Sequence, residues 1–352
     1  MNLYGKTYTR REIEARVSRI EQIGGVRRMT LTEGPEAGVE VIQVRTGGLS
    51  FEVTPSKGMD ISLAEYFGLP LSWLSPNGEV HPSYFSAQGT DWLRSASGGL
   101  LMTCGLTQVG APCVDGSEPL GLHGRAHHLP ARQVSARGFW SGDEYEIEVS
   151  GVMAETSMFG HHLRWTRIVR AHLGHDAFEI RDQVENAGFA KAPHMMLYHF
   201  NFGFPLLSDE TTIEFPSVSV APRDARSDVE GYRRWQAPTA GIEEMVYYHE
   251  PIAHTEGVAT ATIRTPGFPV AGRRIGVELG LSWKVDTLPR LVQWKLPAAG
   301  MYVLGLEPAN CHVEGRPAER EKGTLVYLEP GASATYEIAV RLALSHQPDG
   351  EA

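Results

Sequence analysis

The chain has 352 residues, with 32 Lys plus Arg against 42 Asp plus Glu, which gives a formal net charge of −10. An acidic chain with no basic block is not expected to bind nucleic acid, because phosphate neutralisation needs clustered Lys and Arg. Three Cys make neither a disulfide framework nor a zinc spacing, and they suit a reducing cytoplasm. We find no secretory signal and no apolar run long enough to span a membrane, so we expect a cytoplasmic protein without a membrane partner.

One helix is predicted near the start of the chain. Thr9 and Glu12 can form a capping box, and apolar residues recur at helical spacing from Ile13 to Ile20. The Gly-Gly pair at 24–25 ends the pattern. We therefore expect residues 1–25 to form a short N-terminal helical extension.

Most of the remaining chain alternates apolar and polar residues with period two, which predicts strands. Residues 49–53 and 59–63 flank a turn at Lys57-Gly58, and residues 163–171 and 178–184 form a predicted hairpin. Further strands are predicted at 145–149, 258–265, 275–283, 291–296, 302–306 and 335–342. So many short strands favour a mainly β fold, a large twisted antiparallel β-sandwich. We expect it to form one domain over residues 26–344, with a frayed tail at 345–352.

Two long segments interrupt the strands. Residues 76–99 are rich in Pro and Gly but carry several aromatic residues, so we expect an ordered loop and not a linker. Residues 222–256 form a second long irregular segment. The whole sequence lacks a phosphate-binding glycine loop between a strand and a helix, a Gly-x-Ser-x-Gly motif and a His-Glu-x-x-His metal motif.

Three polar residues stand in apolar surroundings and are candidates for chemistry. His123 lies in a turn between Gly121 and Gly124, which allows close approach of a ligand. His199 lies on a predicted strand, and Glu307 follows another apolar strand. A carboxyl group among apolar neighbours should have a raised pKa, which suits a general base near neutrality. Each residue taken alone could equally be a hydrogen-bonded polar residue of the core.

The order of the three motifs is more specific than any one of them. Gly-Leu-His-Gly at 121–124, Tyr-His-Phe-Asn-Phe at 198–202 and Gly-Leu-Glu-Pro at 305–308 follow one another along the chain. Together they resemble the motifs of the aldose 1-epimerase (galactose mutarotase-like) family, over most of the chain. The resemblance implies the galactose mutarotase-like sandwich and an isomerase that interconverts the anomers of a free sugar without a cofactor or a metal. The initial helix and the turn at 57–61 resemble a divergent branch of the family.

The resemblance also implies roles for individual residues. His199 matches the catalytic acid, Glu307 the catalytic base, and His123 the histidine that holds the ring oxygen or a hydroxyl group. Asn201 is expected to bind substrate, and Asp182, Asn186 and Asn201 could support the site from behind. For Asp182, a structural buried hydrogen bond is favoured over a catalytic role. On this basis we expect His199 and Glu307 to face each other across a sugar ring.

The sequence departs from the family pattern at several positions, and these departures bear on the substrate. Tyr198 and Arg125 stand where the family has Asn and Gly. Lys57 is the nearest replacement for the family's binding Arg, and Asp224 and Asp286 are both candidates for its binding Asp. Arg125, Lys57 and Lys295 together suggest a modified, anionic sugar. Alternatively, Arg125 pairs with Glu118 or Asp115. Three Trp residues could stack on a sugar or pack in the core, at positions 92, 283 and 294.

Two other functions stay open at this point. The chain could be a non-catalytic carbohydrate-binding or sugar-sensing protein, because one fold hosts many functions. It could also be a metal-dependent sugar isomerase that uses some of its 14 His. The sequence leaves the choice of sugar and the formation of a homodimer undecided.

Overall fold

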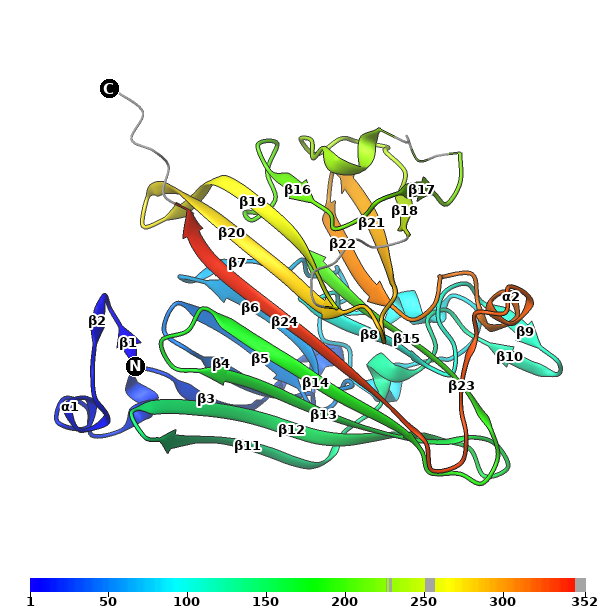
Figure 1. Ribbon diagram of the computed structural model, residues 1–352, viewed down its shortest axis with the longest axis horizontal. Coiled ribbons are helices and arrows are strands. Elements are labelled where there is room, and N and C mark those ends of the chain that lie inside the picture. The colour runs from blue at the N-terminus through cyan, green and yellow to red at the C-terminus, as the bar shows by residue number, and fades with distance from the viewer. Residues whose placement is uncertain (226, 228–229, 251–256, 346–352) are drawn as a thin grey trace.

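Two large antiparallel sheets pack face to face in the computed structural model, which describes residues 1–225, 227, 230–250 and 257–345 (Figure 1). The eight-stranded sheet has the order β11 (Arg132–Ser141), β12 (Glu144–Thr156), β13 (His162–His172), β14 (Ala177–Asn186), β24 (Ser333–Ser345), β20 (Arg273–Lys284), β19 (Val258–Val270) and β16 (Thr212–Glu214). The twelve-stranded sheet runs through β17 (Val220–Pro222), β18 (Met245–His249), β21 (Arg290–Ala298), β22 (Met301–Ala309), β15 (Ala192–Phe202), β8 (Leu101–Leu106), β6 (Asp60–Tyr66), β5 (Leu49–Thr54), β4 (Glu40–Arg45) and β3 (Gly25–Thr30), with β7 (Leu69–Pro70) and β23 (Val326–Leu328) attached. The predicted β-sandwich is therefore confirmed.

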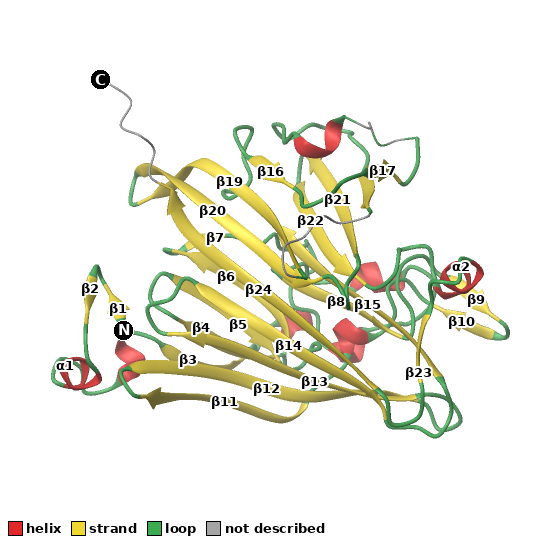
Figure 2. Ribbon diagram, viewed as in Figure 1, coloured by secondary structure: helices red, strands yellow, loops and turns green. Residues whose placement is uncertain are grey.

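Helices are few and short, and they lie outside the two sheets (Figure 2). The α-helices are α1 (Arg10–Glu14) and α2 (Arg316–Glu321). Single 3-10 turns occur at Ile20–Gln22, Gly34–Glu36, Pro82–Tyr84, Asp91–Arg94, Ala126–His128 and Gly231–Arg233. Two small hairpins complete the described elements, β1 (Asn2–Leu3) with β2 (Lys6–Thr7) and β9 (Cys113–Asp115) with β10 (Glu118–Leu120). None of the described helices is long and apolar enough to cross a membrane.

The N-terminal helix is much shorter than predicted. Its capping box forms, because Thr9 accepts from the backbone of Glu12 while the Glu12 carboxylate accepts from the backbone of Thr9. The helix nevertheless ends at Glu14, and of its residues only Ile13 is buried. Val17 and Ile20 pack against the core from a bent chain, so tertiary packing overrides the local helical spacing. Residues 346–352 of the predicted tail lie outside the described residues.

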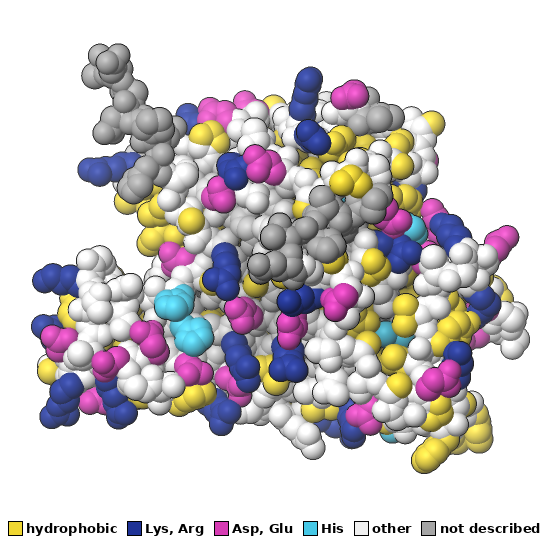
Figure 3. All heavy atoms as spheres, viewed as in Figure 1, with side chains coloured by type: hydrophobic (Ala, Val, Ile, Leu, Met, Phe, Trp, Pro, Cys, Tyr) yellow, Lys and Arg dark blue, Asp and Glu magenta, His cyan; other side chains and the backbone are white. Residues whose placement is uncertain are grey.

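Alternation along each strand places one face in the core. In β13, the inward residues Leu163, Trp165, Arg167 and Val169 are fully or almost fully buried, and the residues that alternate with them are at least partly exposed. Strand β14 pairs with β13 from Leu163 opposite Asn186 to Ala171 opposite Phe178, which confirms the predicted hairpin. The outer face of this sheet carries charged side chains of both signs (Figure 3).

One ion-pair network crosses the sandwich. Arg167 on β13 binds Asp182 of the neighbouring strand β14 at 2.7 Å and Asp60 of the opposite sheet at 2.7 Å. It also donates to the Thr103 hydroxyl on β8, and Tyr198 donates to Asp182 at 2.6 Å. All these side chains are buried, so each charge depends on its partners for compensation.

We predict that Arg167→Met destabilises the fold strongly. The Met side chain fills much of the space but leaves two buried carboxylates without their counter-charge. The free energy of unfolding should fall by about 3–5 kcal/mol, measured by denaturant titration. The control is Arg170→Met on the same strand, where an exposed pair with Glu148 should contribute at most about 1 kcal/mol. Equal effects of the two variants would contradict the prediction.

Candidate active site

The site lies on the face of the twelve-stranded sheet that points away from the eight-stranded sheet. Along β15, Tyr198 and Phe200 point into the sandwich core, and His199 between them points the other way. Every residue of β15 is nevertheless buried, because loops cover this second face as well. They surround a partly open cavity of about 500 Å³, within the size range of small-molecule sites.

His199 and Glu307 lie next to each other on the floor of this cavity. His199 Nε2 is 3.2 Å from Glu307 Oε1. The strands bring them together because β15 and β22 are antiparallel neighbours, paired at Leu197 with Ala309 and at Phe200 with Leu306. The structure thus places both residues in one cavity, but side by side and not on opposite sides of a sugar ring as the sequence led us to expect.

Gly305 makes this close arrangement feasible. A Cβ atom at Gly305 would lie 2.8 Å from Glu307 Oε1, 2.9 Å from Trp294 Cβ and 3.2 Å from His199 Cε1. The two side chains therefore occupy the space that any other residue at position 305 would need for its own.

His123 completes a histidine pair above the floor. Its ring centroid is 6.0 Å from that of His199, and its backbone has a φ of 56°. The backbone is fixed by hydrogen bonds to Gly110 and from Gly105. The flanking Gly124 has a φ of +72° and passes close to the carbonyl oxygen of Gly105, so this glycine permits contact between two backbones and not contact with a ligand.

Two tryptophans and one ion pair form walls that frame these groups. The Trp92 ring centroid lies 5.0 Å from that of His123, with the two rings tilted, and the Trp294 centroid lies 5.5 Å from that of His199. The Trp294 indole donates to Glu244 at 2.9 Å, and Arg223 binds the other oxygen of Glu244 at 3.0 Å. This chain fixes the carboxylate and the guanidinium at the cavity wall.

The burial of these groups sets their protonation. Burial lowers the pKa of His199 to about 3 and that of His123 to about 4. Burial also raises the pKa of Glu307 well above its ordinary value, as the sequence predicted, and the carboxylate of Glu244 adds to this. The floor pair therefore favours its uncharged form, with one proton between Oε1 and Nε2. Nδ1 of His199 and Nδ1 of His123 have no hydrogen-bond partner among the described residues.

Lys57 does not line the cavity. Its ammonium group is fully buried beneath the loop that carries Trp92, where it donates to Ser97 Oγ at 2.8 Å and pairs with Glu79 at 3.4 Å. Through these contacts Lys57 anchors a loop. It does not make the contact with substrate that the sequence predicted.

The other two predicted cations also lie outside the cavity. Arg125 is exposed and lines a separate outer groove with Phe85 and Val114. Asp115 and Glu118, the partners considered for it, bind Arg316 instead. Lys295 is buried on β21 and donates to the backbone carbonyls of Gly231 and Arg234 at 2.8 and 2.7 Å, so it anchors that turn.

The remaining candidates divide between the cavity and its support. Asn201 is buried behind the floor, where its amide donates to the backbone oxygens of His199 and Gly99. Asp182 belongs to the Arg167 network, and Trp283 packs in the core. Asn186 donates to two backbone oxygens at the end of β14. Of the two candidates for a binding Asp, Asp224 pairs with Arg223 at 3.2 Å, and Asp286 is exposed in the turn after β20.

The sequence did not reveal three residues of the cavity wall. Arg223 and Glu244 both lie in the segment predicted to be irregular, Arg223 near its start and Glu244 directly before β18, and no periodicity marks them. Trp73, which lies 6.0 Å from Trp294, counted among the aromatic residues that favoured an ordered loop but was not a candidate for the site. The only local signal for any of the three was the aromatic side chain of Trp73 in a polar, turn-rich stretch. Such a side chain is too common in loops to indicate a binding site.

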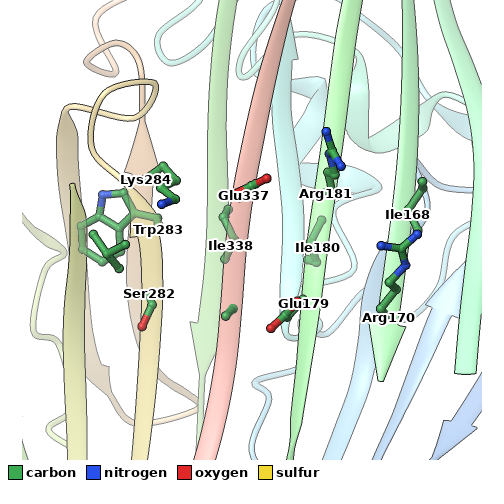
Figure 4. A pocket seen from close by; sticks show the side chains of 12 residues that line it. Ile168, Arg170, Glu179, Ile180, Arg181, Ser282, Trp283, Lys284, Glu337 and Ile338 are labelled. Carbon is green, nitrogen blue, oxygen red and sulfur yellow. The ribbon is translucent and has the colours of Figure 1, made fainter. Parts of the chain in front are cut away.

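A second hollow, of about 280 Å³, lies on the outer face of the eight-stranded sheet (Figure 4). Its polar side chains, among them Arg170, Arg181, Glu179 and Glu337, come from adjacent strands and point outward. They alternate in sign as cross-strand pairs on a solvated sheet commonly do. No three His, Cys, Asp or Glu side chains of the described chain are placed to hold a metal ion.

Comparison with solved structures agrees with this architecture. A protein from Klebsiella pneumoniae, described provisionally as an aldose 1-epimerase, matches with a TM-score of 0.81 and 26% identity over 90% of this chain and 83% of that one. A galactose mutarotase-like protein from Clostridium acetobutylicum matches with a TM-score of 0.60 and 13% identity, over 92% of this chain and 100% of that one. A galactose 1-epimerase from Lactobacillus acidophilus matches with a TM-score of 0.55 and 11% identity, over 91% and 99%. No curated protein matches the sequence.

The fold is therefore that of the galactose mutarotase-like β-sandwich proteins. A family model described as a domain of unknown function, DUF4432, matches residues 36–342. The chain belongs to this family.

We predict that the two cavity histidines stay neutral throughout the physiological pH range. In an NMR titration, the imidazole signals of His199 and His123 should shift only near pH 3 and pH 4, because burial disfavours their charged forms. His312 is an internal comparison. Burial opposes its charge, but contacts with Glu250 and Glu319 outweigh burial and raise its pKa to about 9. Titration of His199 with a midpoint near 6.5 would contradict the prediction.

Proposed function

We propose that the protein is an aldose 1-epimerase-like isomerase that interconverts the anomers of a free sugar. The observation that carries this proposal is the contact between His199 Nε2 and Glu307 Oε1 on the floor of the cavity. Anomerisation requires one group that accepts a proton and one that donates a proton, and both must reach the sugar in the same site.

The reaction opens and recloses a hemiacetal. The anomeric oxygen loses a proton while the ring oxygen gains one, and both oxygens are bonded to the same carbon. Two groups that lie side by side can therefore serve both oxygens at once. Glu307 takes the proton from the anomeric oxygen, and His199 gives one to the ring oxygen. The hemiacetal replaces the direct contact between the two side chains, and because only protons move, no cofactor takes part.

The uncharged resting state suits this task. The pair carries one mobile proton, and a transfer from Glu307 to His199 converts the resting form into the base-and-acid form. Rotation of the aldehyde in the open chain, followed by the reverse transfers, yields the other anomer. The same pair can act on both anomers because its two members exchange roles between opening and closure.

The walls supply binding. His123 is placed to hold a ring or hydroxyl oxygen, and the Trp92 and Trp294 rings offer flat apolar surfaces for a pyranose. Arg223 and Glu244 form a fixed donor and acceptor that suit neighbouring hydroxyl groups.

A reducing cytoplasm is consistent with three free cysteines, Cys104, Cys113 and Cys311.

We predict that Glu307→Gln removes nearly all anomerisation. Gln keeps the shape of the side chain but cannot accept the proton, and loss of a general base typically costs about a hundred- to ten-thousand-fold in rate. Polarimetry or NMR of freshly dissolved pure anomers measures this rate, with the exposed Glu329→Gln as the control. Binding of sugars without anomerisation by the wild-type protein would favour the carbohydrate-binding alternative.

We also predict that Gly305→Ala impairs catalysis while the fold persists. The added methyl group would overlap Glu307 Oε1 and Trp294 Cβ, so His199 and Glu307 must move apart. A loss of at least about tenfold in kcat is expected for a misplaced acid–base pair. The control is Gly280→Ala on β20, where the nearest atom to the added group is 3.5 Å away. Unchanged kcat in Gly305→Ala would show that contact between the two side chains is not needed.

A further inference from the structure

The cavity is mainly apolar, which is unusual for a site that must hold a fully hydroxylated sugar. Beside the aromatic residues, its lining includes Met102, Leu122, Val246, Val292, Met301 and Val313. A sugar hydroxyl pressed against such side chains loses its hydrogen bonds to water and gains none in return. Each such loss costs about 1–3 kcal/mol.

The polar lining residues cannot compensate at every position. Ser75 donates to the Ala96 carbonyl at 2.6 Å, and Asn77 spends amide hydrogens on Leu93 and Ala96. Among the described lining side chains, the polar groups left for a ligand are the floor pair, His123, the ion pair of Arg223 with Glu244, the Trp92 indole N–H and the Asn77 side-chain oxygen.

The charges of the cavity also favour a neutral ligand. Arg223 is the cation among the described lining residues, and its guanidinium already binds Glu244 and Asp224. Glu307 adds a further acidic group. The three cations that suggested an anionic sugar lie elsewhere, so nothing in the described lining compensates a carboxylate or sulfonate.

The apolar residues have a defined position relative to the catalytic pair. Met102 on β8 lies directly opposite His199, and Val292 on β21 lies directly opposite Glu307. The floor is therefore a row of four side chains on four adjacent strands, Met102, His199, Glu307 and Val292, with the acid–base pair in the middle. Adjacent strands are about 4.8 Å apart, so Met102 is the next surface beyond His199.

This row indicates which part of the sugar meets an apolar surface. In a pyranose the ring oxygen joins the anomeric carbon to carbon 5. When the anomeric oxygen lies at Glu307 and the ring oxygen at His199, carbon 5 and its substituent extend beyond His199, over Met102. In most aldohexoses that substituent is a hydroxymethyl group, which would place its hydroxyl against the Met side chain.

We infer that the substrate is a neutral 6-deoxy aldose, whose methyl group at carbon 5 packs on Met102. This inference rests on the proposed function, because it uses the orientation of the hemiacetal over the floor pair. Met102 is then a specificity residue. It touches the substrate away from the reacting atoms and disfavours a hydroxyl at that position.

The test compares sugars that differ by one oxygen atom. The pairs are D-fucose with D-galactose, 6-deoxy-D-glucose with D-glucose, and L-rhamnose with L-mannose. Both anomerisation, by NMR of pure anomers, and binding, by calorimetry, are measured for each sugar. The decisive comparison is the sugar pair with the highest kcat/KM. In that pair, kcat/KM of the deoxy sugar should exceed that of its hydroxylated partner by about 10- to 100-fold, which is the discrimination that an apolar pocket achieves against one hydroxyl group.

The outcomes separate this inference from the proposed reaction. Equal or faster turnover of the hydroxylated sugars would support the reaction and overturn the inference. Tighter binding of a deoxy sugar without turnover would overturn the reaction and, with it, the inference of a substrate. Neither binding nor turnover of any pair would overturn both.

Two substitutions of one residue test the contact itself. Met102→Gln keeps the length of the side chain but adds an amide, so the preference for the deoxy sugar should fall at least about tenfold. Met102→Leu keeps an apolar surface and should retain the preference. Thermal unfolding shows whether each variant folds, and the ratio within a pair is insensitive to the fraction of active protein. An unchanged ratio in Met102→Gln would overturn the assignment of Met102.

Discussion

The buried guanidinium of Arg167 connects the two sheets, and the site depends on that connection. Its carboxylate partners belong to both sheets, with Asp182 on β14 and Asp60 on β6. Each carboxylate also binds a residue close in sequence to a cavity histidine. Asp182 accepts from Tyr198, the residue next to His199, and Asp60 binds His127, four residues beyond His123. A network on the core side of the sheet thus fixes both histidines that face the cavity on its other side.

The cavity itself follows from how two adjacent strands meet. Because β15 and β22 are in register, His199 and Glu307 lie on the same face and in the same row. Gly305 leaves the space into which both side chains lean. Loops then bury most of the surface of the pair, and this burial lowers the pKa of His199 and raises that of Glu307. The pairing of β15 with β22 beneath the loops therefore explains both why His199 and Glu307 are close and why they share a proton.

The loops that cover the floor also determine the character of the site. Lys57 and Lys295 are buried beneath or beside these loops and donate to their oxygen atoms, so their charges stabilise the walls and do not face the ligand. The Arg223–Glu244 pair is the fixed polar element of the wall, held by Trp294. A binding surface with paired charges and apolar floor residues such as Met102 favours a neutral ligand with few hydroxyl groups.

The sequence by itself determined the β-sandwich and the three residues of the floor and turn, His123, His199 and Glu307. Alternation with period two is a local property, and short motifs with a fixed order survive divergence. The tertiary structure decided the rest. Whether Lys57 faces a ligand or a loop depends on chain packing, and Arg223 and Glu244 become neighbours only through the folding of an irregular segment. Local spacing cannot encode such contacts, because they join residues from separate elements through packing and not through periodicity.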